Sequence, residues 1–345
     1  MSKKIIILGI ESSCDDTSAA IISDGYILSN IIANQKVHEK YGGVVPELAS
    51  REHQKNIIPV VDTAIKEAGI KKEDISAISF TKGPGLLGSL LVGSSFAKSF
   101  ALGLDIPLIA VNHMKGHIMA HFIKNKGEEN KQPDFPFLCL TVSGGHTQIV
   151  LVKSVTEMIV IGETLDDAAG EAFDKSAKIL GLSYPGGPLI DKYAKKGDKD
   201  KFTFGRHKVG KYDFSYSGIK TSILRVIEKE VDKNQNFIKE NLEDLCASIQ
   251  HTIVEILIKK ITKASSELRI NEIAIAGGVS ANSYLRTRLI ELQKKQGKNV
   301  FIPKFEYCTD NAAMIAITGY YQFLEKDFSD QSVSPISRLK LYQKI

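Results

Sequence analysis

The feature that most constrains the fold is a strand–turn–strand pattern that occurs twice, each time followed by helices and further strands. In the first half, the apolar runs Ile5–Gly9 and Ala19–Ile22 flank a polar loop. In the second half, Phe137–Val142 and Thr147–Val152 flank the tight turn Ser143-Gly-Gly-His. This repetition indicates an internal duplication and predicts an α/β protein of two lobes with a ligand cleft between them.

The boundary between the lobes is predicted at the polar segment Gly127–Pro136, which contains two prolines. We therefore expect an N-terminal lobe at 1–135 and a C-terminal lobe at 136–310, with a C-terminal helix at about 311–330 rejoining the first lobe. Asn112 is a good helix N-cap, and Thr309-Asp310-Asn311 opens the last helix. Other helices are expected from about Pro46, Asp166, Ser215, Phe237 and Ala281, and further strands at Ile75–Thr81, Pro107–Val111, Glu272–Ala276 and Val300–Ile302.

Composition places the chain among ordinary globular proteins. It has 345 residues, of which 43% are hydrophobic and 25% are charged. Its four cysteines are far apart in sequence and form no CxxC motif, which favours free thiols in a reducing compartment. The first apolar run is too short for a signal peptide, and the best membrane candidate, Leu86–Leu104, carries Lys98 and reads as a buried helix. We expect a soluble, cytoplasmic protein without a membrane partner.

The net charge is only +5, but basic residues are concentrated between 192 and 220. This run can neutralise phosphates in sequence-independent binding, or it can be a solvated surface loop, and charge alone does not decide between them. Its members are Lys192, Lys195, Lys196, Lys199, Lys201, Arg206, Lys208, Lys211 and Lys220.

Four glycine or hydroxyl loops are predicted where a strand ends. They are Ser12–Thr17, Ser143–Thr147, Tyr184–Pro188 and Gly277–Ser283. Glycine lets the backbone approach a ligand, and free N–H groups at a helix start can bind phosphate oxygens. The loops together favour a bound nucleotide, although each one alone is only a turn signal.

His113, His117 and His121 are spaced by four residues, starting one residue after Asn112. Positions i and i+4 lie on one helix face, so two imidazoles there can share a metal ion. A carboxylate would complete the two-histidine, one-carboxylate set that is typical of non-haem iron. Asp310 is a candidate for it, but the residues alone favour an ordinary helix-start acid at that position.

An acidic face is predicted on the helix near Leu165, where Asp167, Glu171 and Asp174 lie at i, i+4 and i+7. Their mutual repulsion favours a ligand-binding role, and an exposed acidic face is the alternative. Asp191 lies on the next helix, just after Gly186-Gly187-Pro188.

Nine motifs, in order over roughly residues 5 to 320, resemble those of the bacterial tRNA adenosine threonylcarbamoyltransferases, once labelled O-sialoglycoprotein endopeptidases. They are Gly9-Ile-Glu-Ser-Ser-Cys-Asp-Asp-Thr17, Gly42–His53, Lys82-Gly-Pro-Gly-Leu-Leu-Gly-Ser89, His113-Met-Lys-Gly-His117, Val142-Ser-Gly-Gly-His-Thr147, Gly170-Glu-Ala-Phe-Asp174, Tyr184-Pro-Gly-Gly-Pro188, Phe214-Ser-Tyr-Ser-Gly-Ile-Lys220 and Ala276-Gly-Gly-Val-Ser-Ala-Asn282. The resemblance implies the actin, hexokinase and Hsp70-like fold, with two RNase H-like lobes around a nucleotide cleft.

The resemblance also implies an activity and a set of site residues. The activity is transfer of the threonylcarbamoyl group from threonylcarbamoyl-AMP to N6 of adenosine 37 in tRNAs that read codons beginning with A, releasing AMP. The metal ligands would be His113, His117 and Asp310, which leaves His121 as a packing residue; the ion would be Fe²⁺, with Zn²⁺ as the alternative. The residues that would contact the adenylate are Thr141, Val142, Ser143, Gly144, Gly145, Asp174, Gly187, Asp191 and Asn282.

Other roles are hypotheses that accompany the resemblance. Asp15, in the first hairpin loop, is our candidate proton acceptor, and its neighbour Asp16 is expected to have no role in the reaction. The family commonly has Glu where Lys115 stands, and we expect Lys115 to be a surface change that points away from the ion. The candidates for tRNA phosphate contact are Arg51, Lys82, Arg206, Lys208 and Lys220. Related enzymes act with a paralogous non-catalytic protein and a small P-loop ATPase, so similar partners are expected here.

Three rival functions remain open. A metallopeptidase could use the histidine helix, but zinc peptidases of the HExxH type need a glutamate after the first ligand, and Met114 stands there. A sugar or acetate kinase, or another ATPase of the same fold, would need no histidine pair. A nucleotide-dependent scaffold would not release AMP when tRNA is added.

Overall fold

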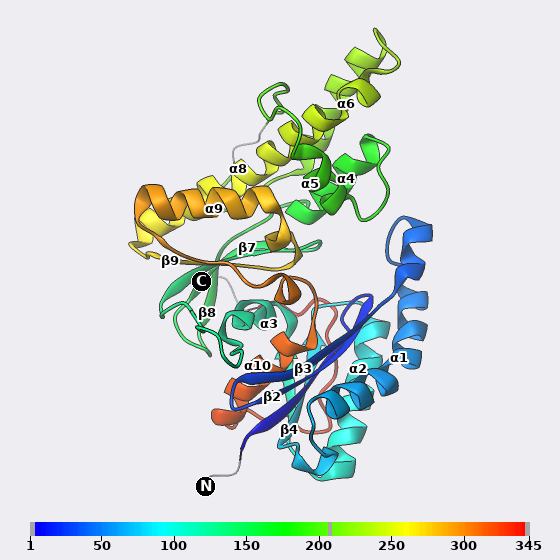
Figure 1. Cartoon of the computed structure of the whole chain (residues 1–345), viewed down its shortest axis with the longest axis vertical. Coiled ribbons are helices and arrows are strands. Elements are labelled where there is room, and N and C mark those ends of the chain that lie inside the picture. The colour runs from blue at the N-terminus through cyan, green and yellow to red at the C-terminus, as the bar shows by residue number, and fades with distance from the viewer. Residues whose placement is uncertain (1–3, 206–208, 342–345) are drawn as a thin grey trace. The chain divides into compact units, whose positions relative to one another are not determined.

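The computed structural model describes residues 4–205 and 209–341, and the chain divides into two compact units (Figure 1). The first unit runs through Gln132 and takes up the chain again from Pro303. The second unit spans Pro133–Ile302.

The first unit is built on a mixed sheet of strand order β3-β2-β1-β4-β5. β1 pairs antiparallel with β2 and parallel with β4. The strands are β1 (Ile6–Glu11), β2 (Asp16–Ser23), β3 (Tyr26–Asn34), β4 (Ala77–Gly83) and β5 (Leu108–Asn112), and the helices are α1 (Pro46–Glu67), α2 (Leu87–Leu104), α3 (His113–Met119) and α10 (Ala312–Leu324). Short 3-10 turns lie at Lys36–Tyr41, Lys72–Asp74, Ala120–Phe122 and Phe305–Tyr307.

The two faces of this sheet are covered differently, as the alternation along β1 dictates. Leu8 and Ile10 are buried in one core cluster with residues of α1 and α2. Gly9 faces the other way, toward α10, where a Cβ atom would lie 2.5 Å from the Ala312 carbonyl oxygen. The absence of a side chain at Gly9 therefore lets α10 lie directly on the strand.

The C-terminal tail, for which the sequence suggested no role, runs back over the first unit. The Ser329 amide donates to the Leu108 carbonyl, and the Ile336 amide donates to the Lys82 carbonyl. The Asn112 side chain, in turn, donates to the carbonyl of Lys340 at 3.1 Å. The tail is thus tied to both ends of β5 and to the carboxyl end of β4.

The second unit has a sheet of order β10-β9-β6-β7-β8. Numbered within its own unit and read from β8, this sheet has its third, second, first, fourth and fifth strands side by side, as the first sheet does. In both sheets the first strand is central, two antiparallel strands follow on one side, and two parallel strands lie on the other. The strands are β6 (Phe137–Val142), β7 (Thr147–Val152), β8 (Met158–Glu163), β9 (Glu272–Ala276) and β10 (Asn299–Phe301). The expected α/β duplication is confirmed.

The helices of the second unit share one large core with its sheet. They are α4 (Ala169–Ile179), α5 (Gly186–Ala194), α6 (Ser217–Val231), α7 (Phe237–Glu240), α8 (Leu242–Leu268) and α9 (Ser283–Gln296), with a 3-10 turn at Gly278–Ala281. The sequence analysis missed β8, an edge strand with every second residue partly exposed. A helix was also expected from about Asp166, whereas α4 begins at Ala169. The Asp166 carboxylate lies before the helix and accepts hydrogen bonds from the segment Ser215–Ser217.

Among the described residues, the 18-residue helix Leu87–Leu104 is the one that is long and apolar enough to cross a membrane by length and composition. Here it contacts β4 and α1, and its buried residues include Gly93, Ala97 and Ala101. The core helix of a soluble protein can be equally long and apolar, and a buried helix was expected at this position.

Candidate functional site

The short helix α3 sets the direction of two histidines. Its first turn is capped by Asn112, whose side-chain oxygen accepts hydrogen bonds from the Met114 and Lys115 amides at 2.9 and 3.2 Å. His113 and His117 are one turn apart and both buried. Their rings meet edge to face with centroids 4.7 Å apart.

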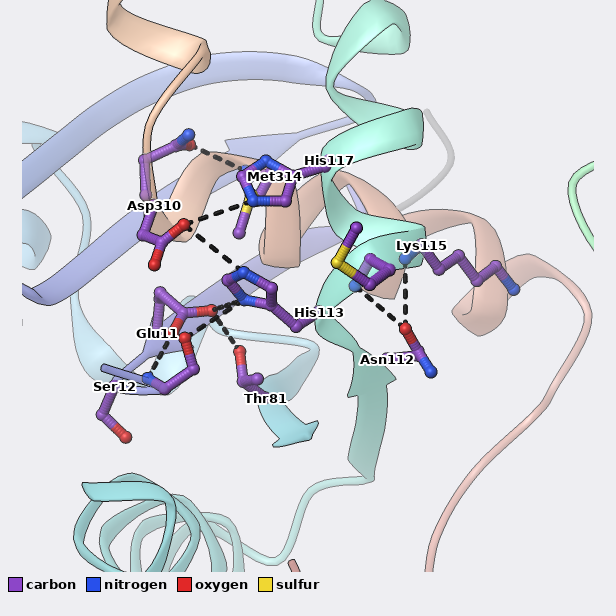
Figure 2. Close-up of polar contacts among 12 residues, drawn as sticks. Glu11, Ser12, Thr81, Asn112, His113, Lys115, His117, Asp310 and Met314 are labelled. Atoms are coloured by element: carbon purple, nitrogen blue, oxygen red, sulfur yellow. Dashed lines mark hydrogen bonds and ion pairs between the residues drawn. The ribbon is translucent and has the colours of Figure 1, made fainter. Parts of the chain in front are cut away.

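Asp310 completes a three-residue group with these histidines (Figure 2). Its Oδ1 lies 3.3 Å from His113 Nε2 and 3.2 Å from His117 Nε2, and the three ligand atoms lie within 4.8 Å of one another. The helix cap that the sequence attributed to Asp310 is provided by Asn311, which accepts from the Met314 amide at 3.0 Å. The Asp310 carboxylate is thereby left to face the histidines.

The electrostatics of the group favour a bound cation. Burial would lower the pKa of His113, but the carboxylates of Asp310 and Glu11 raise it well above its usual value. Burial would likewise raise the pKa of Asp310, but the two histidines hold it far below its usual range. Among the described residues, His117 Nδ1 has no hydrogen-bond partner, and Nε2 has only the contact with Asp310. Two imidazole nitrogens and a carboxylate oxygen at this spacing can hold a divalent metal ion, which would replace the shared protons.

His121 is not part of this group. It lies on the 3-10 turn Ala120–Phe122 that follows α3 and is partly exposed. The change of secondary structure after Met119 ends the one-face spacing, so the i+8 position no longer lies above the other two.

The expectation for Lys115 is half wrong. Its side chain points away from the two histidines, as predicted (Figure 2). It is not a surface residue, however, because only 6% of it is exposed. Every residue of α3 is buried, so the side of the helix opposite the metal group is also enclosed, and burial lowers the pKa of Lys115.

Sequence reasoning missed Glu11 as a site residue. Its carboxylate is fully buried, and Oε2 lies 3.0 Å from His113 Nδ1. The available signal was a charged residue at the end of an otherwise apolar strand, within the first motif of the resemblance.

Asp15 and Asp16 lie on the loop and first strand position that follow β1. Asp15 is partly exposed, in the turn before β2. Burial raises the pKa of Asp16 to about 7, with the Asp15 charge contributing and the Asn34 amide, which donates to Asp16 at 2.7 Å, opposing. A carboxyl that titrates near neutral pH suits proton transfer, so Asp16 competes with Asp15 for the predicted role.

The nine residues predicted for adenylate binding gather in the second unit at the carboxyl ends of β6 and β9 and the adjoining helix starts. Val142 ends β6, and a Cβ atom at Gly277, which follows β9, would lie 2.5 Å from the Val142 carbonyl oxygen. The Gly170 amide at the start of α4 donates to the Ser143 carbonyl. At Gly144 and Gly145, an added Cβ would meet nothing within 4 Å. Packing among the described residues therefore does not require glycine at these two positions.

The polar members of this set bind the glycine loops. Asp174 accepts from the Gly186 and Gly187 amides at 2.8 and 3.2 Å, and Asp191 accepts from the Ser283 hydroxyl at 2.7 Å. The first N–H groups of α5 are thus occupied by a carboxylate, so the loop Tyr184–Pro188 does not offer them to a phosphate. Asn282 caps α9.

The predicted acidic face and basic run are largely neutralised within the second unit. Lys175 pairs with both Asp167 and Glu171. In the basic run, ion pairs join Lys195 to Asp191, Lys196 to Glu243, Lys199 to Asp200, Lys201 to Asp244 and Lys211 to Glu267. These lysine side chains remain largely exposed, which fits both alternatives for the run, and Arg206 and Lys208 lie outside the described residues.

Solved structures with the same fold are related only distantly in sequence. HypF in its phosphate- and nucleotide-bound form aligns with 93% of this chain and 47% of its own, at a TM-score of 0.61 and 15% identity. Component A of the Acidaminococcus fermentans (R)-2-hydroxyglutaryl-CoA dehydratase aligns with 92% of this chain and 98% of its own, at a TM-score of 0.51 and 16% identity. These likenesses support the predicted actin, hexokinase and Hsp70-like fold.

Close relatives share nearly the whole chain. A protein of Christiangramia forsetii is 60% identical over 98% of this chain and 99% of its own length, and one of Porphyromonas gingivalis is 57% identical over 98% and 99%. Both are named tRNA N6-adenosine threonylcarbamoyltransferase, and the family model of that description matches residues 26–317. With the site geometry, these matches show that the chain belongs to the tRNA N6-adenosine threonylcarbamoyltransferase family of transferases.

Proposed function

We propose that this protein transfers the threonylcarbamoyl group of threonylcarbamoyl-AMP to N6 of adenosine 37 in tRNAs that read codons beginning with A, with release of AMP. The observation that carries the proposal is the meeting of His113, His117 and Asp310 from two distant segments, in a chain whose relatives carry that transferase name. The nine motifs of the resemblance support the same substrate pair.

The chemistry sets what the protein must do. The adenine amine is a poor nucleophile because its lone pair is delocalised into the ring, whereas the donor is an activated mixed anhydride. In the transfer, N6 bonds to the carbamoyl carbon, the bond from that carbon to the phosphate oxygen breaks, and AMP leaves with the electron pair. One proton leaves N6. The protein therefore has to position two reactants and accept that proton, and positioning alone can contribute several kcal/mol.

We assign these tasks to residues as follows. His113, His117 and Asp310 would hold one divalent ion, Fe²⁺ by preference and Zn²⁺ as the alternative, and a bound ion supplies Lewis acidity toward a donor oxygen. Thr141–Gly145, Gly187 and the polar residues Asp174, Asp191 and Asn282 would form the adenylate site. Asp15 is the proposed proton acceptor.

Two carboxylate variants separate the candidates for proton transfer. Asp15→Asn should lower turnover while metal content stays normal, and Asp16→Asn is its matched comparison. If Asp15→Asn turns over normally and Asp16→Asn does not, the role passes to Asp16.

We further propose partners and a location. A paralogous non-catalytic protein of the same fold and a small P-loop ATPase would act with this chain, which would work in the cytoplasm. The tRNA contacts would include Arg51 and Lys220, which are exposed in the structure, and the partly buried Lys82.

The test is nucleoside mass spectrometry of unmodified tRNA after incubation with the protein, the adenylate donor and the partner proteins. The expected product is threonylcarbamoyladenosine at position 37 with one AMP released per modified base. A tRNA with guanosine at position 37 is the control. Absence of the product with all components present would refute the proposal, and cleavage of a glycoprotein substrate by the same preparation would favour the peptidase alternative.

A further inference from the structure

Glu11 is a carboxylate placed inside the first unit, at the carboxyl end of β1. It lies on the same strand face as Gly9, toward α10, and its side chain is fully buried. A buried carboxylate is costly unless neighbouring groups donate to it, so its contacts indicate what it is retained for.

Three groups from three segments hold this carboxylate (Figure 2). The Thr81 hydroxyl on β4 donates to Oε2 at 2.5 Å, and the Ser13 amide donates to Oε1 at 2.5 Å. Oε2 also lies 3.0 Å from His113 Nδ1. The Ser13 hydroxyl is a further, neutral contact of the same ring nitrogen at 3.2 Å.

The two nitrogens of His113 therefore face different carboxylates. Nδ1 faces Glu11, and Nε2 faces Asp310 at 3.3 Å, on the side where His117 also lies. A carboxylate at Nδ1 retains the ring proton there, which leaves the Nε2 lone pair available as a metal ligand. His117 has no comparable partner at Nδ1 among the described residues.

We propose that Glu11 is a positioning residue for the metal centre: it fixes the tautomer and the ring orientation of His113, and Thr81 in turn orients Glu11. The inference rests on the proposed ion at His113, His117 and Asp310. It predicts that metal affinity depends on a residue that does not touch the metal.

The first experiment measures Zn²⁺ affinity by competition with a chromophoric chelator, using the full chain. Glu11→Gln removes the negative charge beside His113 Nδ1 and replaces one of the two carboxylate oxygens with an NH₂ donor, at nearly constant volume. It should weaken Zn²⁺ binding by about 10–100-fold. Thr81→Val should weaken it less, because its hydroxyl acts only through Glu11. The matched control is Ser79→Ala, which removes a buried hydroxyl on the same face and should leave the affinity unchanged. Within the described part of the chain, this hydroxyl donates to the Leu8 and Ile315 carbonyls and does not contact Glu11.

The second experiment needs no variant of Glu11 and so is independent of its folding. In the Zn²⁺-loaded wild-type protein labelled with ¹⁵N-histidine, His113 should show a protonated Nδ1 and a metal-bound Nε2, assigned with His113→Gln. Metal on Nδ1 would overturn the inference, as would a folded Glu11→Gln variant with wild-type affinity. If the wild-type chain takes up no Zn²⁺, the proposed metal site fails and this inference fails with it; if it binds and Glu11→Gln binds equally, only this inference fails.

Discussion

Gly9→Ala tests whether the packing of α10 on β1 supports the metal group. The added Cβ would lie 2.5 Å from the Ala312 carbonyl oxygen and 2.6 Å from the Ala316 amide nitrogen, whereas ordinary contact begins near 3.4 Å. These neighbours are backbone atoms, so a side chain cannot rotate away to relieve the clash, and α10 must shift by up to about 0.9 Å. Asp310 lies just before this helix, so the shift should also displace a metal ligand.

The expected cost can be compared with that of a matched glycine. Overpacking of this kind should lower the free energy of unfolding by about 2 kcal/mol, which for a unit of this size lowers Tm by about 4–8 °C. Gly103→Ala, near the end of α2, is the control because its Cβ would meet nothing within 4 Å. There the gain in helix propensity should stabilise the protein by up to about 1 kcal/mol.

The assay is thermal unfolding followed by circular dichroism, together with Zn²⁺ affinity for each variant. Gly9→Ala should lose both stability and affinity, and Gly103→Ala should lose neither. A Gly9→Ala protein that melts within about 1 °C of the wild type would show that α10 does not rest on Gly9 as described.

Three other predictions concern pH, helix capping and RNA binding. Burial raises the pKa of Asp16 to about 7, so between about pH 4 and pH 7 the folded chain holds a proton that the unfolded chain has lost. Stability should therefore fall as pH rises through this range, and Asp16→Asn should flatten the fall of Tm with pH. Parallel Tm–pH profiles for the variant and the wild type would contradict this prediction. Asp166→Ala removes the acceptor for the Tyr216 amide at 2.7 Å and the Ser217 hydroxyl at 2.8 Å, at the start of α6. It should lower the free energy of unfolding, measured with denaturant, by about 1–2 kcal/mol. A decrease below about 0.5 kcal/mol would argue against Asp166 as a cap of α6. Neutralising Arg51, Lys82 or Lys220 should weaken tRNA binding and flatten its salt dependence by about one unit of slope per lost phosphate contact, and an unchanged slope would place the RNA elsewhere.

Local chemistry explains what was predictable from the sequence. The hairpin strands of each sheet, the Asn112 cap and the facing of His113 and His117 follow from periodicity and spacing within a few residues. The role of Asp310 did not follow from its own surroundings, where it resembles a helix cap; only the family resemblance favoured a ligand there. In the structure Asn311, one residue later, takes the capping bond, and the Asp310 carboxylate lies against the two histidines.

Tertiary burial explains what was not predictable. Lys115 points where the helix geometry says it should, but whether that side is solvent or protein depends on the rest of the unit, which encloses α3. Glu11 reads as a polar strand end, and its partner at His113 lies on another element. The edge strand β8 alternates in burial but not in sequence, because Met158–Ile161 are all apolar; this run was a usable strand signal that the prediction overlooked.

The central claim is that an ion held by His113, His117 and Asp310 is required for threonylcarbamoyl transfer to tRNA. The most direct measurement is threonylcarbamoyladenosine formation by protein stripped of metal, then reloaded with Fe²⁺ or Zn²⁺, with donor, tRNA and partner proteins supplied. We predict that stripping abolishes product, that reloading restores it in the wild type, and that Asp310→Asn stays inactive under both conditions. A stripped protein that modifies tRNA at the rate of the loaded one would contradict the account.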